Sequence, residues 1–198
     1  LENNPDYAAA ATGEASVFPP TQPIFYRTDR LELRDQGWFF FSETPDVIYS
    51  RTFDGSWPAF TSWAEFADKR SGQVFKVFNI HTDYASRDNR LRSVALVADR
   101  IAPALAAKET LFVIGDLNGR IGDAVVDVLA DAGLNFAPVK GATVHFNRGI
   151  NLFGPIDHIA ISGDATLVGA PVVLRHKYAG EWPTDHYPVV ADYRLGAP

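Results

Sequence analysis

The sequence lacks two residue types completely, cysteine and methionine, over its 198 residues. Without cysteine, the chain has no disulfide framework, no thiolate-bound zinc or iron–sulfur centre and no thiol nucleophile. Without methionine, Leu1 is not the initiator of an unprocessed reading frame. We therefore expect the chain to be a processed product or one part of a longer protein.

Long apolar runs and clusters of basic residues are also missing. No stretch approaches the roughly 18 apolar residues that a membrane-spanning helix needs, and no basic segment followed by an apolar run marks a signal peptide. The net charge is −6, which argues against a protein that binds nucleic acid mainly through a basic face. A phosphate substrate stays compatible with this charge, because a bound divalent cation supplies local positive charge.

The residues that are present predict one globular domain over residues 1–198. Hydrophobic residues make up 46% of the chain and charged residues 21%, which is the balance of an ordinary domain with a sizeable core. No internal repeat, linker or low-complexity segment interrupts it. Residues 1–23 carry scattered prolines and look irregular, as a loop or a weak helix.

Short aromatic and β-branched runs bounded by turn residues predict strands. These runs are PIFYR, LEL, WFFFS, QVFKVFNIHT, TLFVIGDL, ATVHF, IDHIAIS, TLVGAPVVL and YPVVADYRL. Apolar residues at helical spacing predict helices over 86–105 and 122–134, with Ser86 or Asp88 as the first N-cap and Gly133 ending the second helix. The order of elements predicts an α/β or mixed α+β fold with helices covering sheets.

Polar side chains of a catalytic type follow or precede several of these strands. They are His81, Asp116, Asn118, Asp157, Asp185 and His186. A continuous apolar strand such as LFVIG is buried on both faces, so a carboxylate at its end lies at the rim of a sheet, where ligands commonly bind. Carboxylates with an amide suit a hard divalent cation, and histidines suit proton transfer. Together they are the set that metal-assisted phosphoester hydrolysis needs.

Each of these residues also has a structural interpretation. Asp116 and Asn118 are turn formers before Gly119, and the pair Asp185–His186 suits a turn or a helix cap. The coincidence of all six residues at strand ends favours the catalytic interpretation. The remaining histidines have no such position and are predicted to be structural; they are His145, His158 and His176.

Four segments in this order, FNIHTDY, IGDLNG, IDHIAIS and PTDHYPVVADYRL, resemble the endonuclease/exonuclease/phosphatase superfamily. This superfamily shares the fold of pancreatic deoxyribonuclease, bacterial sphingomyelinases and inositol polyphosphate 5-phosphatases. The segments PIFYRTDRLEL and WFFFSETPD resemble its bacterial branch, and the resemblance covers about residues 23–196. It implies a four-layered α/β sandwich, in which two packed mixed β-sheets have helices outside.

The resemblance also implies a role for each matching residue. His81 would contact the scissile phosphate, Asp116 would lie near the metal and the attacking water, and Asn118 would contact phosphate. Asp157 would orient the catalytic His186. Asp185 would be a metal-site carboxylate together with Asp116. The implied cofactor is Mg²⁺, with Mn²⁺ or Ca²⁺ as alternatives, and the implied activity is hydrolysis of a phosphoester.

The chain departs from the family pattern at its beginning. Family members start with a strand that bears an asparagine and a second strand that ends in the chief metal-binding glutamate, and neither is present here. We therefore expect an additional strand, from absent residues or from a second polypeptide, to cover residues 24–33. Several relatives carry an acidic partner for His81 near Pro20–Gln22, where this chain reads PTQ, and Tyr84 stands where the family often has histidine.

Three alternatives differ from this interpretation. GDLNGR is one substitution from the GDLHGR motif of calcineurin-like metallophosphoesterases, but that class also needs D-x-H and GNH motifs, which are absent. A serine hydrolase would need a G-x-S-x-G elbow, which is also absent. A non-catalytic binding module or inactive remnant on the same scaffold gains weight from the missing glutamate.

The sequence does not choose among nucleic acids, phospholipids and small phosphoesters as substrates, because loops around a common frame decide this. Four aromatic residues near predicted loops are candidates for stacking on bases or sugars or for reaching lipid, although packing is the commoner use of such residues. They are Trp57, Phe60, Trp63 and Trp182.

Overall fold

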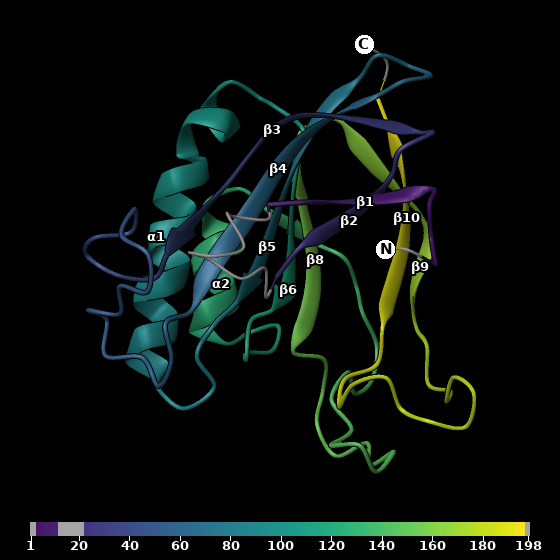
Figure 1. The fold of residues 1–198 in the computed structure, drawn as a ribbon. Coiled ribbons are helices and arrows are strands. Elements are labelled where there is room, and N and C mark those ends of the chain that lie inside the picture. Colours follow the sequence, from purple (N-terminus) through teal and green to yellow (C-terminus); the bar gives the residue numbers. More distant parts are fainter. Residues whose placement is uncertain (1–2, 12–21, 197–198) are drawn as a thin grey trace.

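The computed structural model describes residues 3–11 and 22–196, which form strands and two helices arranged in layers (Figure 1). The strands are β1 (Tyr7–Ala10), β2 (Ile24–Arg27), β3 (Leu31–Phe40), β4 (Phe60–Asp68), β5 (Val74–His81), β6 (Leu111–Asp116), β7 (Asn135–Phe136), β8 (Asp157–Ser162), β9 (Ala165–Val173) and β10 (Val189–Leu195). The helices are α1 (Arg87–Ala106) and α2 (Ala124–Asp131). No helix in the described ranges combines the length and apolarity needed to cross a membrane.

A six-stranded mixed sheet, in the order β3-β4-β5-β6-β8-β7, forms the centre of the molecule. Strands β5 and β6 are parallel and are joined by the crossover helix α1, whereas the other neighbours in this sheet are antiparallel. Parallel strands joined through a helix end at the same edge of a sheet. This arrangement brings the end of β5 beside the end of β6.

The local sequence explains how this crossover begins and ends. The Ser86 side chain accepts a hydrogen bond from the Asn89 amide at 3.1 Å and caps α1, as the sequence predicted. Gly115, one residue before the end of β6, has φ of +127°, and a side chain there would collide with the Ile80 carbonyl oxygen of β5. Glycine in FVIGD therefore allows the two strand ends to approach closely.

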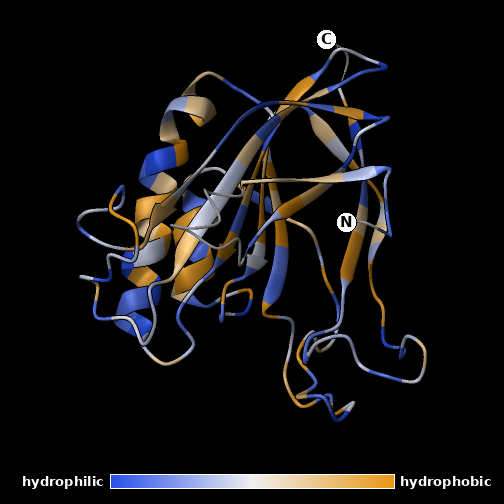
Figure 2. Ribbon diagram, viewed as in Figure 1, coloured by the Kyte–Doolittle hydropathy of each residue, from blue (hydrophilic) through white to orange (hydrophobic). Residues whose placement is uncertain are grey.

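Both helices cover one face of the six-stranded sheet and bury the largest apolar cluster against it. From the helices this cluster includes Val97, Ile101 and Leu129, and from the sheet Ile80 and Leu111, all at most 1% exposed. Figure 2 shows apolar segments in the central strands and in both helices. Burial of these side chains removes apolar surface from water and holds the edge that carries the site against the helical layer.

The opposite face of the sheet is covered by two separate two-stranded sheets, β1-β2 and β9-β10. The first packs Ile24 against Ala64 and Phe66 of β4, and the second places the Tyr193 ring 5.2 Å from the Phe112 ring of β6. The described residues thus form three layers, and the predicted fourth layer of helices is not among them. The fourth layer is absent from the described residues because both helices pack their apolar faces against the same face of the six-stranded sheet.

Several strand predictions are wrong, and the two-residue strand β7 was also not predicted. β4 was not predicted, because neighbours cover both of its faces and its sequence FTSWAEFAD shows no regular alternation of apolar and polar residues. LEL and WFFFS were predicted as separate strands but form one strand, β3, with a register shift between Leu33 and Asp35. ATVHF is not a strand, since it makes only the isolated bridge Val144–His186 before the chain turns.

The prediction that residues 1–23 are irregular is wrong for Tyr7–Ala10. This segment is β1, which pairs antiparallel with β2 in the register Ala10–Ile24. The aromatic and apolar residues of β2 therefore have a strand partner on one side from within the chain. Residues 3–6, 11, 22 and 23 are irregular as predicted, and residues 1–2 and 12–21 lie outside the described residues.

Candidate active site

Three of the predicted residues lie side by side across three neighbouring strands. His81 ends β5, Asp116 ends β6 and Asp157 begins β8. The sheet pairs His81 with Asp116 in parallel register and Asp116 with Asp157 in antiparallel register. Neighbouring strands in a sheet are about 4.8 Å apart. The backbone therefore presents an imidazole and two carboxylates as a row along one edge of the sheet.

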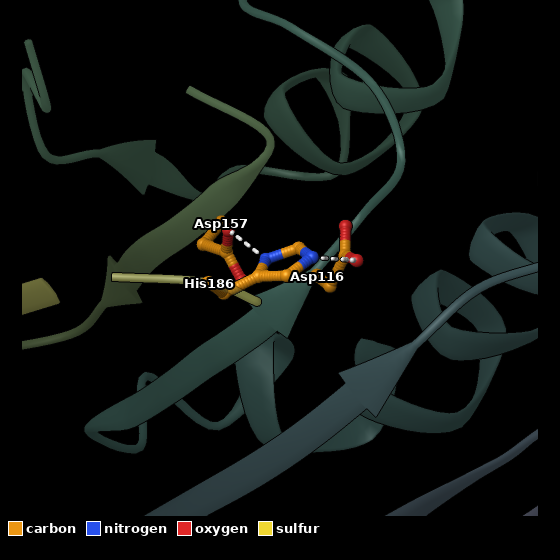
Figure 3. A group of neighbouring side chains, drawn as sticks. All are labelled: Asp116, Asp157 and His186. Atoms are coloured by element: carbon orange, nitrogen blue, oxygen red, sulfur yellow. Dashed lines mark hydrogen bonds and ion pairs between the residues drawn. The ribbon is translucent and has the colours of Figure 1, made fainter. Parts of the chain in front are cut away.

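His186 comes to this row from the segment before β10. Its Nδ1 lies 2.8 Å from Asp157 Oδ2, and its Nε2 lies 3.9 Å from Asp116 Oδ2 (Figure 3). The ring therefore lies between the two carboxylates, with one nitrogen hydrogen-bonded to Asp157. This contact joins residues 29 positions apart in the sequence, and the predicted hydrogen bond between them is confirmed.

Thr143 holds the backbone on both sides of that contact and was missed by the sequence analysis. Its hydroxyl accepts hydrogen bonds from the amides of Ile156 (3.0 Å) and Asp157 (3.2 Å), and its carbonyl accepts one from the Tyr187 amide (2.7 Å). Thr143 is fully buried. A buried threonine in an irregular segment carries no signal in the sequence, since its partners are set by tertiary packing.

Asp116 is the central group of the site. Burial, together with the charge of Asp157, raises the pKa of Asp116 from 3.8 to about 7. The backbone amide of Asn118 donates a hydrogen bond to Asp116 Oδ1 at 2.7 Å, and this hydrogen bond lowers the pKa of Asp116. A second negative charge in a partly dehydrated position is unfavourable, so Asp116 readily takes up a proton or a cation near neutral pH.

The two site histidines have pKa values that shift in opposite directions. The hydrogen bond to Asp157 raises the pKa of His186, although burial opposes this. Burial lowers the pKa of His81, and the nearby His186 lowers it further. A raised and a lowered pKa side by side favour one protonated and one neutral imidazole, which suits a site that must both donate a proton and bind an anion.

His81 is placed by Asp116 and by an aromatic neighbour. Its Nε2 lies 3.6 Å from Asp116 Oδ2, and its ring centroid lies 5.0 Å from that of Trp57. The loop that carries Trp57 is held by Asp83, a fully buried carboxylate that accepts hydrogen bonds from the amide and hydroxyl of Ser56. Trp57, which the sequence analysis named as an aromatic residue near a loop, packs against His81 of the site. The sequence analysis did not identify Asp83 as the residue that holds this loop.

Asn118 ties two strand ends together. Its side-chain Nδ2 donates to the Thr82 carbonyl at 2.9 Å, and its backbone has a left-handed φ of 45°. Non-glycine residues adopt this conformation rarely, with asparagine among the more tolerant. The turn-former interpretation of Asn118 is therefore consistent with the structure, and its predicted contact with phosphate stays a prediction.

All six predicted residues line one cavity of about 1100 Å³. The structure thus confirms the predicted location of these residues at one rim: His81, Asp116, Asn118, Asp157, Asp185 and His186. Their predicted catalytic roles stay predictions. The other histidines lie outside its lining, and their described contacts are structural. The His145 ring is buried against Tyr187, the His158 ring bonds the Gly119 carbonyl, and the exposed His176 ring packs on Tyr178.

The other aromatic residues named from the sequence serve packing. Phe60 and Trp63 belong to β4 rather than to a loop; Phe60 is 3% exposed, and Trp63 stacks on Phe78. The Trp182 ring lies 4.4 Å from that of His145. The predicted proximity to a loop is wrong for Trp63, which lies within β4, because that strand was not recognised in the sequence. Phe60 is the first residue of β4 and follows a loop.

The donor atoms suit a hard divalent cation. Among the described residues, Asp116, Asp157 and His186 form a group whose ligand atoms lie within 4.8 Å of one another. Asp185 lines the same cavity but is not a member of that group. Carboxylate oxygens are preferred ligands of Mg²⁺, and the raised pKa of Asp116 shows negative charge that a cation would compensate. The residues therefore fit a metal, with no preference among Mg²⁺, Mn²⁺ and Ca²⁺.

The fold and the site have counterparts among solved structures. An endonuclease/exonuclease/phosphatase family protein from Bacteroides thetaiotaomicron matches with a TM-score of 0.83 and 26% identity, over 97% of this chain and 76% of that one. The chain is a structural match to the endonuclease/exonuclease/phosphatase family. A mannosyl-6-phosphatase from the same organism matches this endonuclease/exonuclease/phosphatase-like chain with a TM-score of 0.83 and 27% identity, over 96% of this chain and 78% of that one.

Solved structures with lower sequence identity share the fold alone. TDP2 from D. rerio, in complex with a single-strand DNA product, matches with a TM-score of 0.69 and 15% identity, over 98% of this chain and 79% of that one. No protein-family model matches the sequence, and no curated protein sequence matches it. The resemblance predicted from the four motifs, including its bacterial branch, is confirmed by structure, over about three quarters of the relatives' length.

Proposed function

We propose that this chain is a divalent-cation-dependent phosphoesterase. The observation that carries the proposal is the row His81–Asp116–Asp157 on three paired strands, with the His186 ring held between the two carboxylates. The phosphoesterase scaffold of the endonuclease/exonuclease/phosphatase family supports it. The presence of both a candidate proton donor and a candidate cation site in one cavity distinguishes this proposal from a binding module.

The proposed cation ligands are Asp116 and Asp185, with Asp157 close by. A bound cation would polarise the phosphoryl oxygens and lower the pKa of a bound water. Asp116 is the best-supported ligand, because burial and the charge of Asp157 disfavour its ionised form and a cation would compensate for this. Asp185 is exposed at the cavity rim, next to His186 in sequence.

His186 is the proposed proton-transfer group. Asp157 accepts the hydrogen bond at Nδ1, which leaves Nε2 directed toward Asp116 and the cavity. Because the pKa of His186 is raised, a larger share of the ring is protonated at neutral pH and can donate a proton at Nε2. His81, with its pKa lowered, is proposed to contact the phosphate. Asn118 is proposed to donate to the phosphate through the second N–H of its side-chain amide, since the first donates to the Thr82 carbonyl.

The charges of the cavity favour a small phosphoester over nucleic acid. Its lining carries four carboxylates, Asp116, Asp123, Asp157 and Asp185, against one arginine, Arg120, and two histidines. Binding of a nucleic-acid backbone requires several lysines or arginines along a groove. One bound cation would compensate the negative charge of a single phosphate group here. The lining lacks the positive charges needed to compensate the successive phosphates of a nucleic acid. The similarity to a mannosyl-6-phosphatase supports a phosphomonoester of a sugar.

A panel assay tests the proposed function. With excess Mg²⁺, we expect turnover of sugar phosphomonoesters to exceed that of oligonucleotides and phospholipids. Chelation with EDTA should reduce it by at least about a hundredfold, and added Mg²⁺ or Mn²⁺ should restore it. Turnover that survives EDTA would contradict the cation requirement. Absence of both turnover and Mg²⁺ binding would instead favour the non-catalytic module.

We also propose that additional strands pair with free edges of the two small sheets. Within the described ranges, β2 pairs only with β1 and β10 only with β9, so each has an edge without a strand partner. Between the β9-β10 sheet and the six-stranded sheet lies a cleft of about 580 Å³ lined partly by Phe75, Phe112 and Tyr193. An apolar sheet face and unpaired edges are a template for another strand. A second polypeptide, or residues outside 1–198, would supply it.

Amide hydrogen exchange tests these free edges. In the chain of 198 residues, amides of β2 and β10 that point away from β1 and β9 should exchange at least about a hundredfold faster than those of β5 and β6, which have strands on both sides. A polypeptide that completes the sheet should slow exchange in β2 and β10 without affecting β5. Equal protection of all four strands in the isolated chain would exclude free edges.

A further inference from the structure

The cavity has an aromatic rim that the proposed chemistry does not use. Four aromatic side chains line it although they are largely exposed: Phe25 (59%), Tyr84 (71%), Phe146 (45%) and Phe153 (49%). Exposed aromatic rings gathered around one cavity indicate a binding surface for a partly apolar ligand. Phe146 and Phe153 belong to one segment, 144–156, which also leads into Asp157.

The segment that carries the two phenylalanines is built onto the catalytic residues. The amides of His145 and Phe146 both donate to the Asp185 carbonyl, at 2.8 and 3.2 Å. The His145 ring is fully buried, with its centroid 4.1 Å from that of Tyr187, the residue after His186. Any ligand on Phe146 would therefore lie next to the proposed proton donor.

Backbone strain keeps Phe146 at the cavity instead of in the core. Phe146 and Asn147 both have a left-handed φ of 56°. For a non-glycine residue this conformation is about 1–2 kcal/mol less favourable than the right-handed one. Such strain persists where surrounding structure holds it and is concentrated at functional sites. Here it leaves a large apolar side chain in water, an arrangement that packing within the described residues does not explain.

The two rings form a corner and not a slot. Their centroids are 6.0 Å apart and their planes meet at 74°. A flat nucleobase stacks best in a slot between parallel rings, whereas a corner offers one ring face and one ring edge. The C–H bonds on one side of a pyranose chair carry a small positive charge, which is attracted to the negative face of an aromatic ring.

Polar groups suitable for hydroxyls lie beside this corner. Arg120 lines the cavity, and its stem lies against the same segment, since a Cβ placed on Gly154 would be 3.2 Å from Arg120 Cδ. Arg120 makes no ion pair among the described residues. Asp123 lines the cavity next to it. A guanidinium donates to hydroxyls and a carboxylate accepts from them.

We propose that Phe146, Phe153 and Arg120 form a subsite that binds the sugar ring of a sugar phosphomonoester, beside the phosphate position at His81 and His186. This inference rests on the proposed function. It deepens that proposal by assigning a binding site to the sugar, which is the leaving group of the hydrolysis. The subsite acts in binding, so it selects the substrate and takes no part in proton transfer.

Binding of phosphonates that cannot be hydrolysed tests the subsite separately from catalysis. The probes are a hexose 6-phosphonate, methylphosphonate and the methylenephosphonate of adenosine, measured by calorimetry with Mg²⁺ on the chain of 198 residues. The hexose phosphonate should bind at least about tenfold more tightly than methylphosphonate. Phe146→Ala and Phe153→Ala should each weaken the hexose phosphonate at least about fivefold, the scale expected for loss of one aromatic contact, and leave methylphosphonate unchanged.

Leu152→Ala is the matched control, because Leu152 is 71% exposed in the same segment and does not line the cavity. It should change neither affinity. Equal binding of hexose phosphonate and methylphosphonate, or preference for the adenosine probe, would overturn the sugar subsite while leaving the proposed phosphoesterase intact. Failure of all three probes to bind would overturn both proposals.

Discussion

Replacement of His186 with alanine should lower the cation-dependent kcat by at least about a hundredfold, the lower end for loss of general acid–base catalysis. The His186 ring is the only imidazole in the described residues with a carboxylate at hydrogen-bond distance from one nitrogen, and its other nitrogen points into the cavity. The fold should survive, because the side chain lies at the rim and is 24% exposed. Steady-state kinetics and circular dichroism on the same preparation would check both statements.

The companion variant Asp157→Asn separates catalysis from a structural tie between strands. The asparagine keeps the shape but loses the charge, so kcat should fall with a smaller change in KM. The pKa of His186, measured by NMR titration, should also fall, because the hydrogen bond to Asp157 is the main cause of its rise. His176→Ala, at an exposed histidine outside the cavity, is the control for both measurements. Near-normal turnover in a folded His186→Ala protein would make the Asp157–His186 pair structural.

Replacement of Asp116 with asparagine should have opposite effects on activity and on stability. Turnover should fall at least about a hundredfold, because the variant loses the best-supported cation ligand. Without metal, however, the variant should be more stable than the natural chain at pH 8. The pKa of Asp116 rises from 3.8 to about 7 on folding, so its ionised form is disfavoured by the folded state. Asparagine removes that charge and keeps the size of the side chain.

The pH dependence follows from the direction of the shift. An acid whose pKa is raised on folding holds its proton more tightly in the folded state, so its contribution favours folding most below pH 3.8. That contribution declines as the pH rises from 3.8 and is fully lost above about 7. At 1.36 kcal/mol per pKa unit, the upper bound is about 4 kcal/mol. Because the charge of the neighbouring Asp157 is one cause of this rise and the two carboxylates are coupled, we expect about 1–2 kcal/mol at pH 8.

Urea unfolding in EDTA at pH 4 and pH 8 measures this difference. The gain in unfolding free energy from Asp116→Asn should be larger at pH 8 than at pH 4. Saturating Mg²⁺ should stabilise the natural chain and not the variant, because ligands that bind only the folded state stabilise it. Asp99→Asn, at an exposed carboxylate on α1, should show neither effect. A variant that is less stable than the natural chain at pH 8 would show that Asp116 is a structural hydrogen-bond acceptor.

The sequence predicted the individual strand ends well, because the signals there are local. An apolar run such as VFKVFNI followed by His81 is typical of a buried strand that reaches a rim, and this is where β5 ends. The Ser86 cap and the stop at Gly133 also rest on residues adjacent in sequence. Tertiary packing therefore left the ends of both helices near the positions that the local sequence predicted.

Central strand β4 shows where local patterns fail. Its even-numbered residues, such as Ala64, face β1 and β2, and Trp63 packs toward the helical layer. Covering both faces removes the alternation that identifies a strand. The aromatic rim likewise had no signal, since Phe146 and Phe153 resemble core residues in sequence. Their exposure depends on how segment 144–156 is anchored to Asp185.

The amino-acid order was sufficient to predict that six polar residues gather at one rim and that the chain resembles the endonuclease/exonuclease/phosphatase family. The register of three strands, the ring of His186 between two carboxylates and the raised pKa of Asp116 required the folded chain. The reason is physical: residue type and spacing along the chain specify which groups a strand carries. Distances between strands, and the burial that shifts a pKa, arise only when segments far apart in sequence pack together.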